Sequence, residues 1–503
     1  MTNLFRFVPI LACCLTTATL HADVRLPALI SDHMVLQADK PTPIWGWANP
    51  GESVTVTLDN ASVSTTADQS GNWNVKLPPH AVGGPHQLQV KGNNALTVND
   101  VLIGEVWLGS GQSNMAMTVN RAEDFEKEEA AANFPQIRMF VVSSTAAPTA
   151  QADCQGSWLV CSPQTVARFS ATAYFFGREL HQVLGVPVGL INSSVGGTPI
   201  ESWISPEAQA ASPELKPLFA ATTSDDAAFD PAQAKAKYER DLEAWQAAQK
   251  KARAAGKPAP KRPQDPVATH QRKGNVGGLF NGKIAPLVQY RIRGALWYQG
   301  EANSVPSKAP FYKYQLPLLV TDWRTRWGYE FPFAWVQLPN FGGPGRDWPT
   351  VREAMRESLK LPQTGMAITL DIGEEKDIHP KNKQDVGKRL ALWALGTVYG
   401  KSGPTSGPLP AGQERRGNAI AVRFRHADGG LMAKGDNLTG FEVAGEQGFQ
   451  PAKATIAGDT VVVSSPEVAS PKAVRYAWEN NPAASLFNAA GLPASPFSVQ
   501  VTP

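Results

Sequence analysis

The spacing of apolar residues changes twice along the chain, and these changes restrict the possible folds. Between residues 23 and about 100, apolar and polar residues alternate, for example at 54–58, which is the pattern of half-buried strands. From about 101 to 400, short apolar segments such as 188–191 are separated by helical patterns, which indicates an α/β domain. The alternation returns after about 401. The sequence therefore predicts an α/β domain between two β-rich regions.

Four regions are predicted along the chain. They are a signal peptide (1–22), a β-sandwich-like domain (23–100), an α/β domain (101–400) and a β-rich domain (401–503). Within the α/β domain, residues from about 205 to 275 are rich in Ala, Lys and Gln, and Tyr238, Leu242 and Trp245 fall at helical spacing. We interpret this segment as a helical insertion whose charged face contacts solvent, with a partner-binding face as the alternative.

The N-terminus has the pattern of an export signal. Arg6 precedes the apolar run at 7–15, and small residues follow up to Ala22. We therefore expect a secreted or periplasmic protein after cleavage. The sequence before Cys13 also fits a lipoprotein box, so a lipid anchor is the alternative. No later segment is apolar for long enough to span a bilayer.

Net charge and motif content exclude several function classes. The chain has 47 Lys and Arg against 44 Asp and Glu, a formal net charge of +3, and it has no basic stripe for nucleic acid. It contains no phosphate-binding loop, dinucleotide fingerprint or HExxH motif, and its eight His residues are dispersed. We expect neither a nucleic-acid partner nor a nucleotide or metal cofactor. The oligomeric state stays open.

Cleavage of the predicted signal peptide would remove Cys13 and Cys14 and leave two cysteines, Cys154 and Cys161. In an exported protein, two cysteines this close in sequence predict a local disulfide that staples a loop. Neither has a His nearby in sequence that would activate it as a nucleophile.

Three polar clusters follow apolar segments of the α/β domain, where the carboxyl ends of parallel strands bind ligands. The first contains Ser113 in the motif GSGQSNM, the second contains Gly196 and Gly197, and the third contains Asn303. Ser113 fits either a catalytic nucleophile or the cap of the next helix. The glycine N–H groups and the Asn amide fit either an oxyanion hole or ordinary turns.

A fourth cluster, DIHP at 377–380, precedes a helical pattern at 385–398. Pro380 near the first turn of that helix would anchor the backbone and leave the His379 ring at the loop. Asp377 can orient the imidazole, so His379 fits a general base for a serine hydroxyl, with a surface His as the alternative. The combination of a Ser, amide donors and an acid–His pair in one domain favours nucleophilic catalysis.

Several motifs in the same order resemble those of one family. The chain reads GQSNM at 111–115, WYQGEAN at 297–303 and DIHP at 377–380, and it opens with LISDHMVLQ at 29–37 and PIWGW at 43–47. It resembles the sialate O-acetylesterase family, a branch of the SGNH hydrolases. The resemblance implies a flavodoxin-like α/β/α catalytic domain flanked by β-sandwich-like N- and C-terminal regions.

The resemblance also implies residue roles. Ser113 would be the nucleophile of an acetyl-enzyme mechanism, His379 the general base and Asp377 its orienter, with no cofactor. The Ser113 N–H, Gly196 or Gly197, and Asn303 would bind the oxyanion. Many SGNH enzymes place the acid three residues before the His, where this chain has Lys376. A Ser–His dyad, or another acid such as Asp371, is therefore an alternative.

The substrate implied by the resemblance is an O-acetylated carbohydrate. Gln112, Gln299 and Glu301 lie in the matching motifs and are candidate substrate contacts, and Trp203 could stack on a sugar ring or pack in the core. The family name indicates acetylated sialic acid, and acetylated xylan or xyloglucan from plant cell walls is the alternative.

Two other function classes fit parts of the sequence. A glycoside hydrolase would pair Glu301 with a second carboxylate such as Asp371 or Glu374. A noncatalytic carbohydrate-binding protein would use only the β-rich regions and their aromatic residues. Neither class needs the Ser, Asn and His set.

Overall fold

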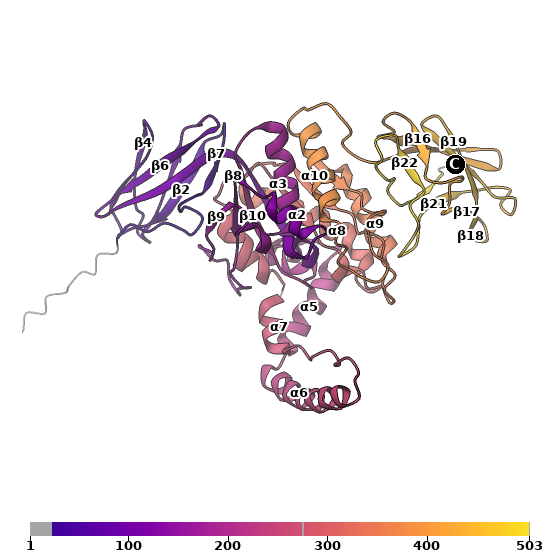
Figure 1. The fold of residues 1–503 in the computed structure, drawn as a ribbon, viewed down its shortest axis with the longest axis horizontal. Coiled ribbons are helices and arrows are strands. Elements are labelled where there is room, and N and C mark those ends of the chain that lie inside the picture. Colours follow the sequence, from indigo (N-terminus) through magenta and orange to yellow (C-terminus); the bar gives the residue numbers. More distant parts are fainter. Residues whose placement is uncertain (1–22, 274–275, 502–503) are drawn as a thin grey trace, which may run out of the picture.

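The computed structural model describes residues 23–273 and 276–501, so the predicted signal peptide lies outside the described residues. Figure 1 shows three parts side by side, with the N-terminal β-rich region and the C-terminal β-rich region on opposite sides of a central α/β domain. No helix among the described residues is both long and apolar enough to cross a bilayer.

A mostly parallel sheet forms the centre of the molecule. Its strand order is β13-β12-β11-β7-β10-β8-β9, and only β9 runs antiparallel to its neighbour. The strands are β7 (Ala95–Gly111), β8 (Phe134–Val141), β9 (Trp158–Cys161), β10 (Val188–Ser194), β11 (Gly294–Tyr298), β12 (Phe333–Val336) and β13 (Thr364–Ala367). The predicted α/β class is confirmed.

Helices cover both faces of this sheet, so its strands are buried on both sides. On one face lie α3 (Ala171–Leu184) and α10 (Lys383–Thr397), and on the other α8 (Tyr312–Trp327) and α9 (Trp348–Glu357). Strand β11 illustrates the alternation: Leu296 joins the core cluster of α3 and α10, whereas Trp297 joins that of α8 and α9. Two short helices, α1 (Ser113–Ala116) and α2 (Phe125–Ala130), follow β7.

Strand β7 sits where the chain direction across the sheet reverses. The segments that follow it build β8, β9 and β10 on one side, and the chain then returns to place β11, β12 and β13 on the other. Such a reversal opens a crevice at the carboxyl ends of the strands, which is the usual ligand position in an open α/β sheet. The residues after Gly111 therefore enter a crevice.

The N-terminal region shares β7 with the central domain. It contains β1 (Val35–Gln37), β2 (Thr42–Trp47), β3 (Ser53–Leu58), β4 (Ala61–Thr66), β5 (Asn72–Leu77) and β6 (Gly83–Lys91). The first part of β7 pairs with β6, and its second part pairs with β10 and β11. The domain boundary that the sequence places near residue 100 thus falls inside a continuous strand.

The C-terminal region consists of three small antiparallel sheets. They are β14 (Leu409–Arg416), β15 (Ala419–Arg425), β20 (Thr460–Ser464) and β19 (Lys453–Ala457); β18 (Gly448–Pro451), β17 (Phe441–Gly445), β21 (Ala473–Tyr476) and β23 (Phe497–Gln500); and β16 (Leu431–Ala433) with β22 (Leu486–Asn488). Arg352 of α9 ties this region to the central domain. Its buried guanidinium donates to the carbonyls of Leu338 and Pro339 and to those of Glu479 and Asn480.

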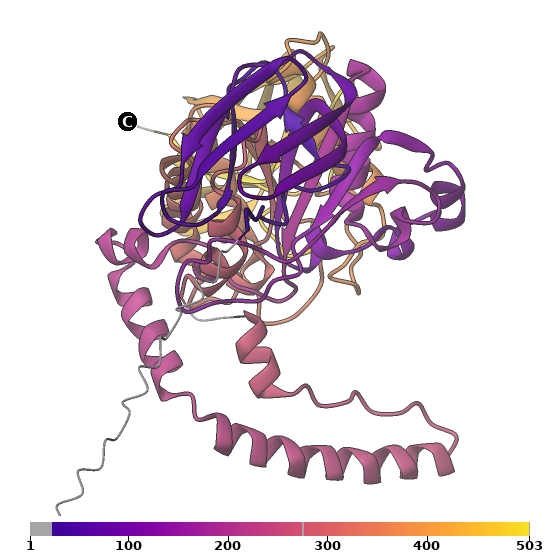
Figure 2. The same ribbon diagram turned by 90° about the vertical axis from the view of Figure 1, so that its left-hand side faces the viewer.

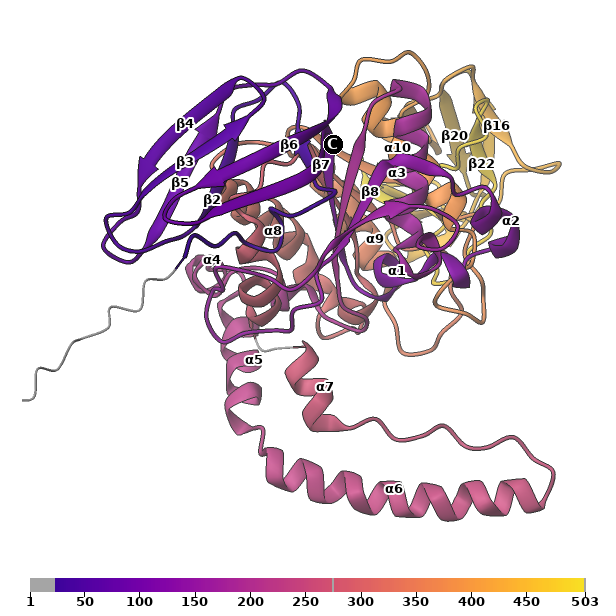
Figure 3. The ribbon, with the colours of Figure 1, turned by 60° about the vertical axis from the view of Figure 1, so that its left-hand side comes forward.

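Four helices occupy the segment interpreted as an insertion: α4 (Pro206–Ala211), α5 (Lys216–Ala228), α6 (Pro231–Ala254) and α7 (Pro266–Lys273). We call residues 216–273 the arm. Figures 2 and 3 show the arm projecting from the central domain, with α6 lying apart from the core. None of the 24 residues of α6 is buried.

The disulfide predicted between Cys154 and Cys161 is wrong, because both thiols are free and buried. Cys161 ends β9, and its Sγ lies 3.8 Å from the carbonyl oxygen of Ala132, within the core cluster of α3. Cys154 packs into the other core cluster with Trp158. Burial raises the pKa of each thiol to about 12. Proximity in sequence did not place the two side chains in one cluster.

Candidate active site

Ser113 is the first residue of α1 and directly follows the turn that ends β7. Gly111 adopts a φ of +135°, and a Cβ at this position would lie 2.2 Å from the carbonyl oxygen of Tyr298. Only glycine fits such a backbone approach. The Gln112 N–H donates to the same Tyr298 carbonyl at 2.9 Å, which fixes the turn. Ser113 is therefore held at the crevice, and it also begins a helix.

His379 lies against Ser113, although the two residues are far apart in sequence. The imidazole Nε2 is 2.8 Å from the Ser113 Oγ, which is hydrogen-bond distance. His379 sits in the loop before α10, as the sequence indicated. A serine hydroxyl and an imidazole nitrogen at this distance can transfer a proton.

The acid partner is held less closely. Asp377 Oδ1 accepts the backbone N–H of His379 at 2.8 Å, but it lies 3.7 Å from the imidazole Nδ1. The Asp377 side chain is 48% exposed. The alternative acid, Asp371, forms a bidentate ion pair with Arg389 at 2.6 and 2.8 Å. Asp377 is therefore the carboxylate near His379, and Asp371 has a different partner.

The pKa of His379 is lowered by its surroundings. Burial is the largest cause, and the positive charges of Arg121 and Lys383 act in the same direction, whereas Asp377 opposes them. A lowered pKa keeps the imidazole neutral at neutral pH. Neutral Nε2 can accept the Ser113 proton, as a general base must.

Two glycines adjoin the nucleophile on the strand β10 side. A Cβ on Gly196 would lie 3.4 Å from the Ser113 Cβ, so the turn after β10 comes close to Ser113. Gly197 has a φ of +71°, and both glycines line the same cavity as Ser113 and His379. The sequence interpretation brought these residues together correctly in space.

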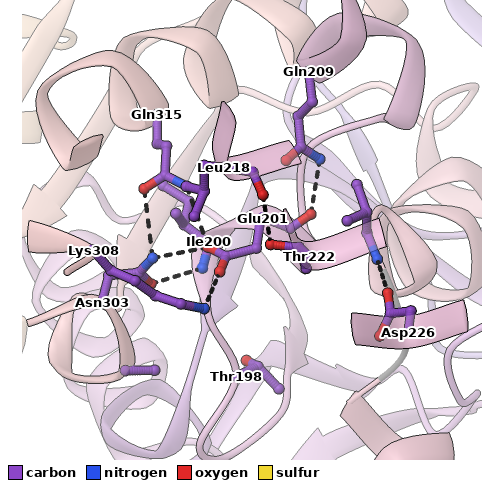
Figure 4. A network of polar contacts seen from close by, with 12 residues as sticks. Thr198, Ile200, Glu201, Gln209, Leu218, Thr222, Asp226, Asn303, Lys308 and Gln315 are labelled. Atoms are coloured by element: carbon purple, nitrogen blue, oxygen red, sulfur yellow. Dashed lines mark hydrogen bonds and ion pairs between the residues drawn. The ribbon is translucent and has the colours of Figure 1, made fainter. Parts of the chain in front are cut away.

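Asn303, by contrast, is not placed to bind an oxyanion. It is fully buried, and its amide nitrogen donates to Glu201 at 2.8 Å and to Gln315 at 3.4 Å. Its Oδ1 accepts the N–H of Ile200 at 2.9 Å. Figure 4 shows this network, in which Lys308 pairs with the other oxygen of Glu201 at 2.5 Å. The prediction for Asn303 is wrong because these buried partners use its amide.

Gln112 offers an amide at the cavity instead. It is largely buried but lines the cavity, and its Oε1 accepts the N–H of Ala302 at 3.2 Å. An N–H can donate only to the oxygen of the amide, so this bond fixes the side-chain orientation and leaves the NH₂ group as a donor. Gln112 therefore fits its predicted place beside the substrate.

Asn114 connects the nucleophile segment to the histidine loop, a role that the sequence did not indicate. Its Nδ2 donates to Glu301 Oε1 at 2.5 Å and to the carbonyl of Ile378 at 3.0 Å. Burial raises the pKa of Glu301. The buried Lys383 on the adjoining helix α10 has its pKa lowered to about 7, also by burial. Glu301 lines the cavity but is only 2% exposed.

Two predicted substrate contacts lie in the core. Trp203 is fully buried, and its indole N–H donates to the Thr198 hydroxyl at 2.9 Å. Gln299 is also fully buried and donates to the Thr198 carbonyl and to Asn303. Both predictions are wrong, because the side chains of Trp203 and Gln299 point into the protein core and do not line the cavity.

Ser113 and His379 line a cavity of about 1060 Å³. Its lining carries four cations at Arg121, Arg346, Lys261 and Lys308. Lys308 is paired with Glu201, but the first three form no ion pair within the described part of the chain. Arg346 donates only to the backbone carbonyl of Glu301. The lining contains no Phe, Tyr or Trp, so polar and charged groups must recognise the ligand.

Within residues 23–273 and 276–501, no three His, Cys, Asp or Glu side chains form a group that could hold a metal ion. Neither carboxylate named as the partner of Glu301 in a glycoside hydrolase lines the cavity: Asp371 pairs with Arg389, and Glu374 Oε1 accepts the backbone N–H of Lys381 at 2.9 Å. The 2.8 Å approach of His379 Nε2 to Ser113 Oγ at this cavity fits nucleophilic attack by the serine.

Known proteins are similar to this chain in sequence and fold. The family model described as a sialic acid-specific acetylesterase among carbohydrate esterases matches residues 103–252 and 281–395. The sialate O-acetylesterases of Rattus norvegicus and Homo sapiens are 32% and 30% identical to the chain; each alignment covers 95% of the chain, with 94% of the rat and 93% of the human protein. A crystal structure of a carbohydrate acetylesterase from Xanthomonas citri is 35% identical, with a TM-score of 0.80 over 95% of this chain and 99% of that one.

Proposed function

We propose that Ser113 and His379 catalyse the reaction of this chain, which belongs to the sialic acid-specific acetylesterase family of carbohydrate esterases. The chain is accordingly a carboxylic-ester hydrolase of O-acetylated sugars. The observation that supports the catalytic pair is the 2.8 Å distance between Ser113 Oγ and His379 Nε2.

The reaction follows from this geometry. Ser113 Oγ attacks the acetyl carbonyl carbon while His379 Nε2 takes the hydroxyl proton. We assign the stabilisation of the negative oxygen that forms to the N–H groups of Ser113 and of Gly196 or Gly197 and to the Gln112 amide, all of which line the cavity. His379 then gives its proton to the sugar oxygen as the ester bond breaks. Water, activated by the same imidazole, hydrolyses the acetyl-enzyme and releases acetate.

We propose acetylated sialic acid as the substrate. Sialic acid carries a carboxylate, and a guanidinium group binds a carboxylate through paired hydrogen bonds. Arg121 and Arg346 line the cavity that contains Ser113, and no carboxylate of the described residues is paired with either. These two guanidinium groups suit an anionic sugar better than a neutral wall polysaccharide.

Acetate release by purified protein tests this proposal. The substrates are 4-nitrophenyl acetate, O-acetylated sialic acid and acetylated xylan and xyloglucan oligosaccharides. Ser113→Ala and His379→Ala should each lower kcat by at least about 10³-fold, and the exposed Ser402→Ala should match wild type. Wild-type activity retained by Ser113→Ala would refute the assignment. A preference for xylan or xyloglucan over sialic acid would refute the proposed substrate.

We also propose that the protein is exported. Its support is the basic, apolar and small-residue order of the first 22 residues. The N-terminal sequence of the protein from the cell exterior or periplasm should begin near Asp23. A protein that stays in the cytoplasm with its original N-terminus would contradict this proposal.

A further inference from the structure

The arm forms one wall of the catalytic cavity. Thr222 and Asp226 of α5, Lys261 and Gln264 of the α6–α7 connection, and His270 of α7 line the same cavity as Ser113. At about 1060 Å³, the cavity is slightly larger than the roughly 300–1,000 Å³ range of sites that hold drug-sized ligands. An acetyl ester occupies only the end near Ser113, so the arm side has room for further sugar.

The arm residues at the cavity carry the groups that bind sugar hydroxyls. Thr222 and Asp226 are four residues apart on α5 and so share one face of the helix. An ammonium, an amide and a carboxylate together offer both donors and acceptors. Within the described residues, the Lys261 and Gln264 side chains form no hydrogen bond or ion pair. These two side chains are therefore open to a ligand.

Aromatic contacts hold the arm residues in place. The Trp245 indole N–H donates to the Pro260 carbonyl at 2.7 Å, and the Arg262 guanidinium lies 5.8 Å from the centre of the Trp245 ring. Lys261 stands between these two tethered residues. On the other side of the connection, the His270 ring stacks on Phe229 at 4.0 Å. The wall of the cavity is thus a built structure.

Core packing does not explain the arm. Helix α6 buries none of its residues, although most helices in proteins are stabilised by packing an apolar face. A helix of this kind costs conformational entropy without returning core contacts. It does carry Trp245, whose indole N–H binds the α6–α7 connection at Pro260.

The geometry points to a second sugar-binding subsite on the arm, formed around Lys261 and Gln264, so that the enzyme acts on acetylated oligosaccharides in preference to free acetylated monosaccharides. The acetylated residue lies at Ser113 and the next sugar residue contacts the arm. This inference rests on the proposed function, whose catalytic end the cavity shares.

The test compares two double variants of equal composition. Lys261→Ala with Gln264→Ala removes the proposed contacts, and Lys250→Ala with Gln246→Ala removes a lysine and a glutamine from exposed positions of α6 outside the cavity. Both are assayed with O-acetylated sialic acid, an O-acetylated sialyl-oligosaccharide and an acetylated xylo-oligosaccharide. The readout is the ratio of kcat/KM for each oligosaccharide to that for the monosaccharide.

We expect this ratio to fall about tenfold in the Lys261 and Gln264 variant, as for the loss of one or two hydrogen bonds, and to stay within about twofold in the α6 control. The oligosaccharide whose ratio falls identifies the glycan class. An equal fall of activity on all substrates, an unchanged ratio for both oligosaccharides, or a wild-type preference for the monosaccharide would overturn the subsite.

A binding measurement separates this inference from the catalytic proposal. In the Ser113→Ala background, calorimetry gives the Kd of each intact oligosaccharide without turnover. The Lys261 and Gln264 substitutions should raise that Kd about tenfold and the α6 control should not. If no ester is hydrolysed, the catalytic proposal fails, and the Kd values still decide the subsite. Equal Kd values in the two double variants refute it.

Discussion

The position of Asp377 predicts an acid partner of modest catalytic weight. Its Oδ1 lies 3.7 Å from His379 Nδ1, beyond hydrogen-bond distance, and its side chain is 48% exposed. Two unit charges about 4 Å apart attract by about 1 kcal/mol when water screens them. Asp377→Asn removes this attraction for the imidazolium but keeps an oxygen for the backbone N–H of His379. We therefore expect kcat/KM at its high-pH plateau to fall only about fivefold.

The same substitution should shift the pH profile in a known direction. Activity requires the neutral imidazole, so kcat/KM rises with pH through the pKa of His379. Burial already lowers this pKa, and Asp377 raises it in opposition. Without the Asp377 charge the pKa falls further, so the midpoint moves to lower pH, by less than about one pH unit.

The assay is the pH dependence of kcat/KM with 4-nitrophenyl acetate for wild type, Asp377→Asn and Asp377→Ala. The Ala variant also removes the acceptor of the His379 N–H, so its further loss measures loop positioning. In a triad whose buried aspartate hydrogen-bonds Nδ1, the Asn substitution costs about 10⁴-fold in kcat. A loss of that size, or a midpoint that moves to higher pH, would refute the dyad-like geometry.

Three further changes test the supports of the site. Asn114→Ala deprives the buried Glu301 carboxylate of its donor and frees the histidine loop, so we expect about 2–3 kcal/mol lower unfolding free energy and a lower kcat, measured by denaturant titration and steady-state kinetics. Arg352→Met removes the donor of the Leu338 and Glu479 carbonyls and one of the two donors of the Pro339 and Asn480 carbonyls, and it should cost at least about 3 kcal/mol in the same titration; an unchanged midpoint would contradict this. A thiol assay without reductant on residues 23–503 should find Cys154 and Cys161 unreactive when folded and both reactive when unfolded, whereas no reaction after unfolding would indicate a disulfide.

Sequence reasoning grouped Ser113 with His379, which the structure places 2.8 Å apart, because each residue sits in a short, local motif. Ser113 follows a strand and a glycine turn, and His379 precedes a helix, so both positions depend on nearby residues. The α/β class followed from the change in apolar spacing near residue 100. The continuous strand across that point was not foreseen, because the change in spacing falls inside β7, which pairs first with β6 and then with β10.

The rest of the site depends on contacts between distant segments, which a single sequence does not encode locally. Asn303 has the residue type of an oxyanion donor, and only its burial against Glu201 reveals that its amide is already used. Trp203 likewise has the residue type that stacks on sugars, and only its burial in the core shows that it cannot contact the substrate. Arg121 and Arg346 belong to no motif, so only the folded chain brings them to the cavity.

The charge of Arg121 links substrate binding to proton transfer. In the free enzyme Arg121 lowers the pKa of His379. A bound sialate carboxylate at Arg121 would offset that positive charge, so the pKa of His379 should be higher in the complex than in the free enzyme. The pH profile of kcat reports the pKa of His379 in the complex, and that of kcat/KM reports its pKa in the free enzyme.

With acetylated sialic acid, the kcat midpoint should therefore lie at higher pH than the kcat/KM midpoint. With a neutral acetyl ester the two should coincide, and Arg121→Gln should raise the free-enzyme midpoint and abolish the difference. Coincident midpoints for acetylated sialic acid in the wild type would show that the carboxylate does not bind at Arg121.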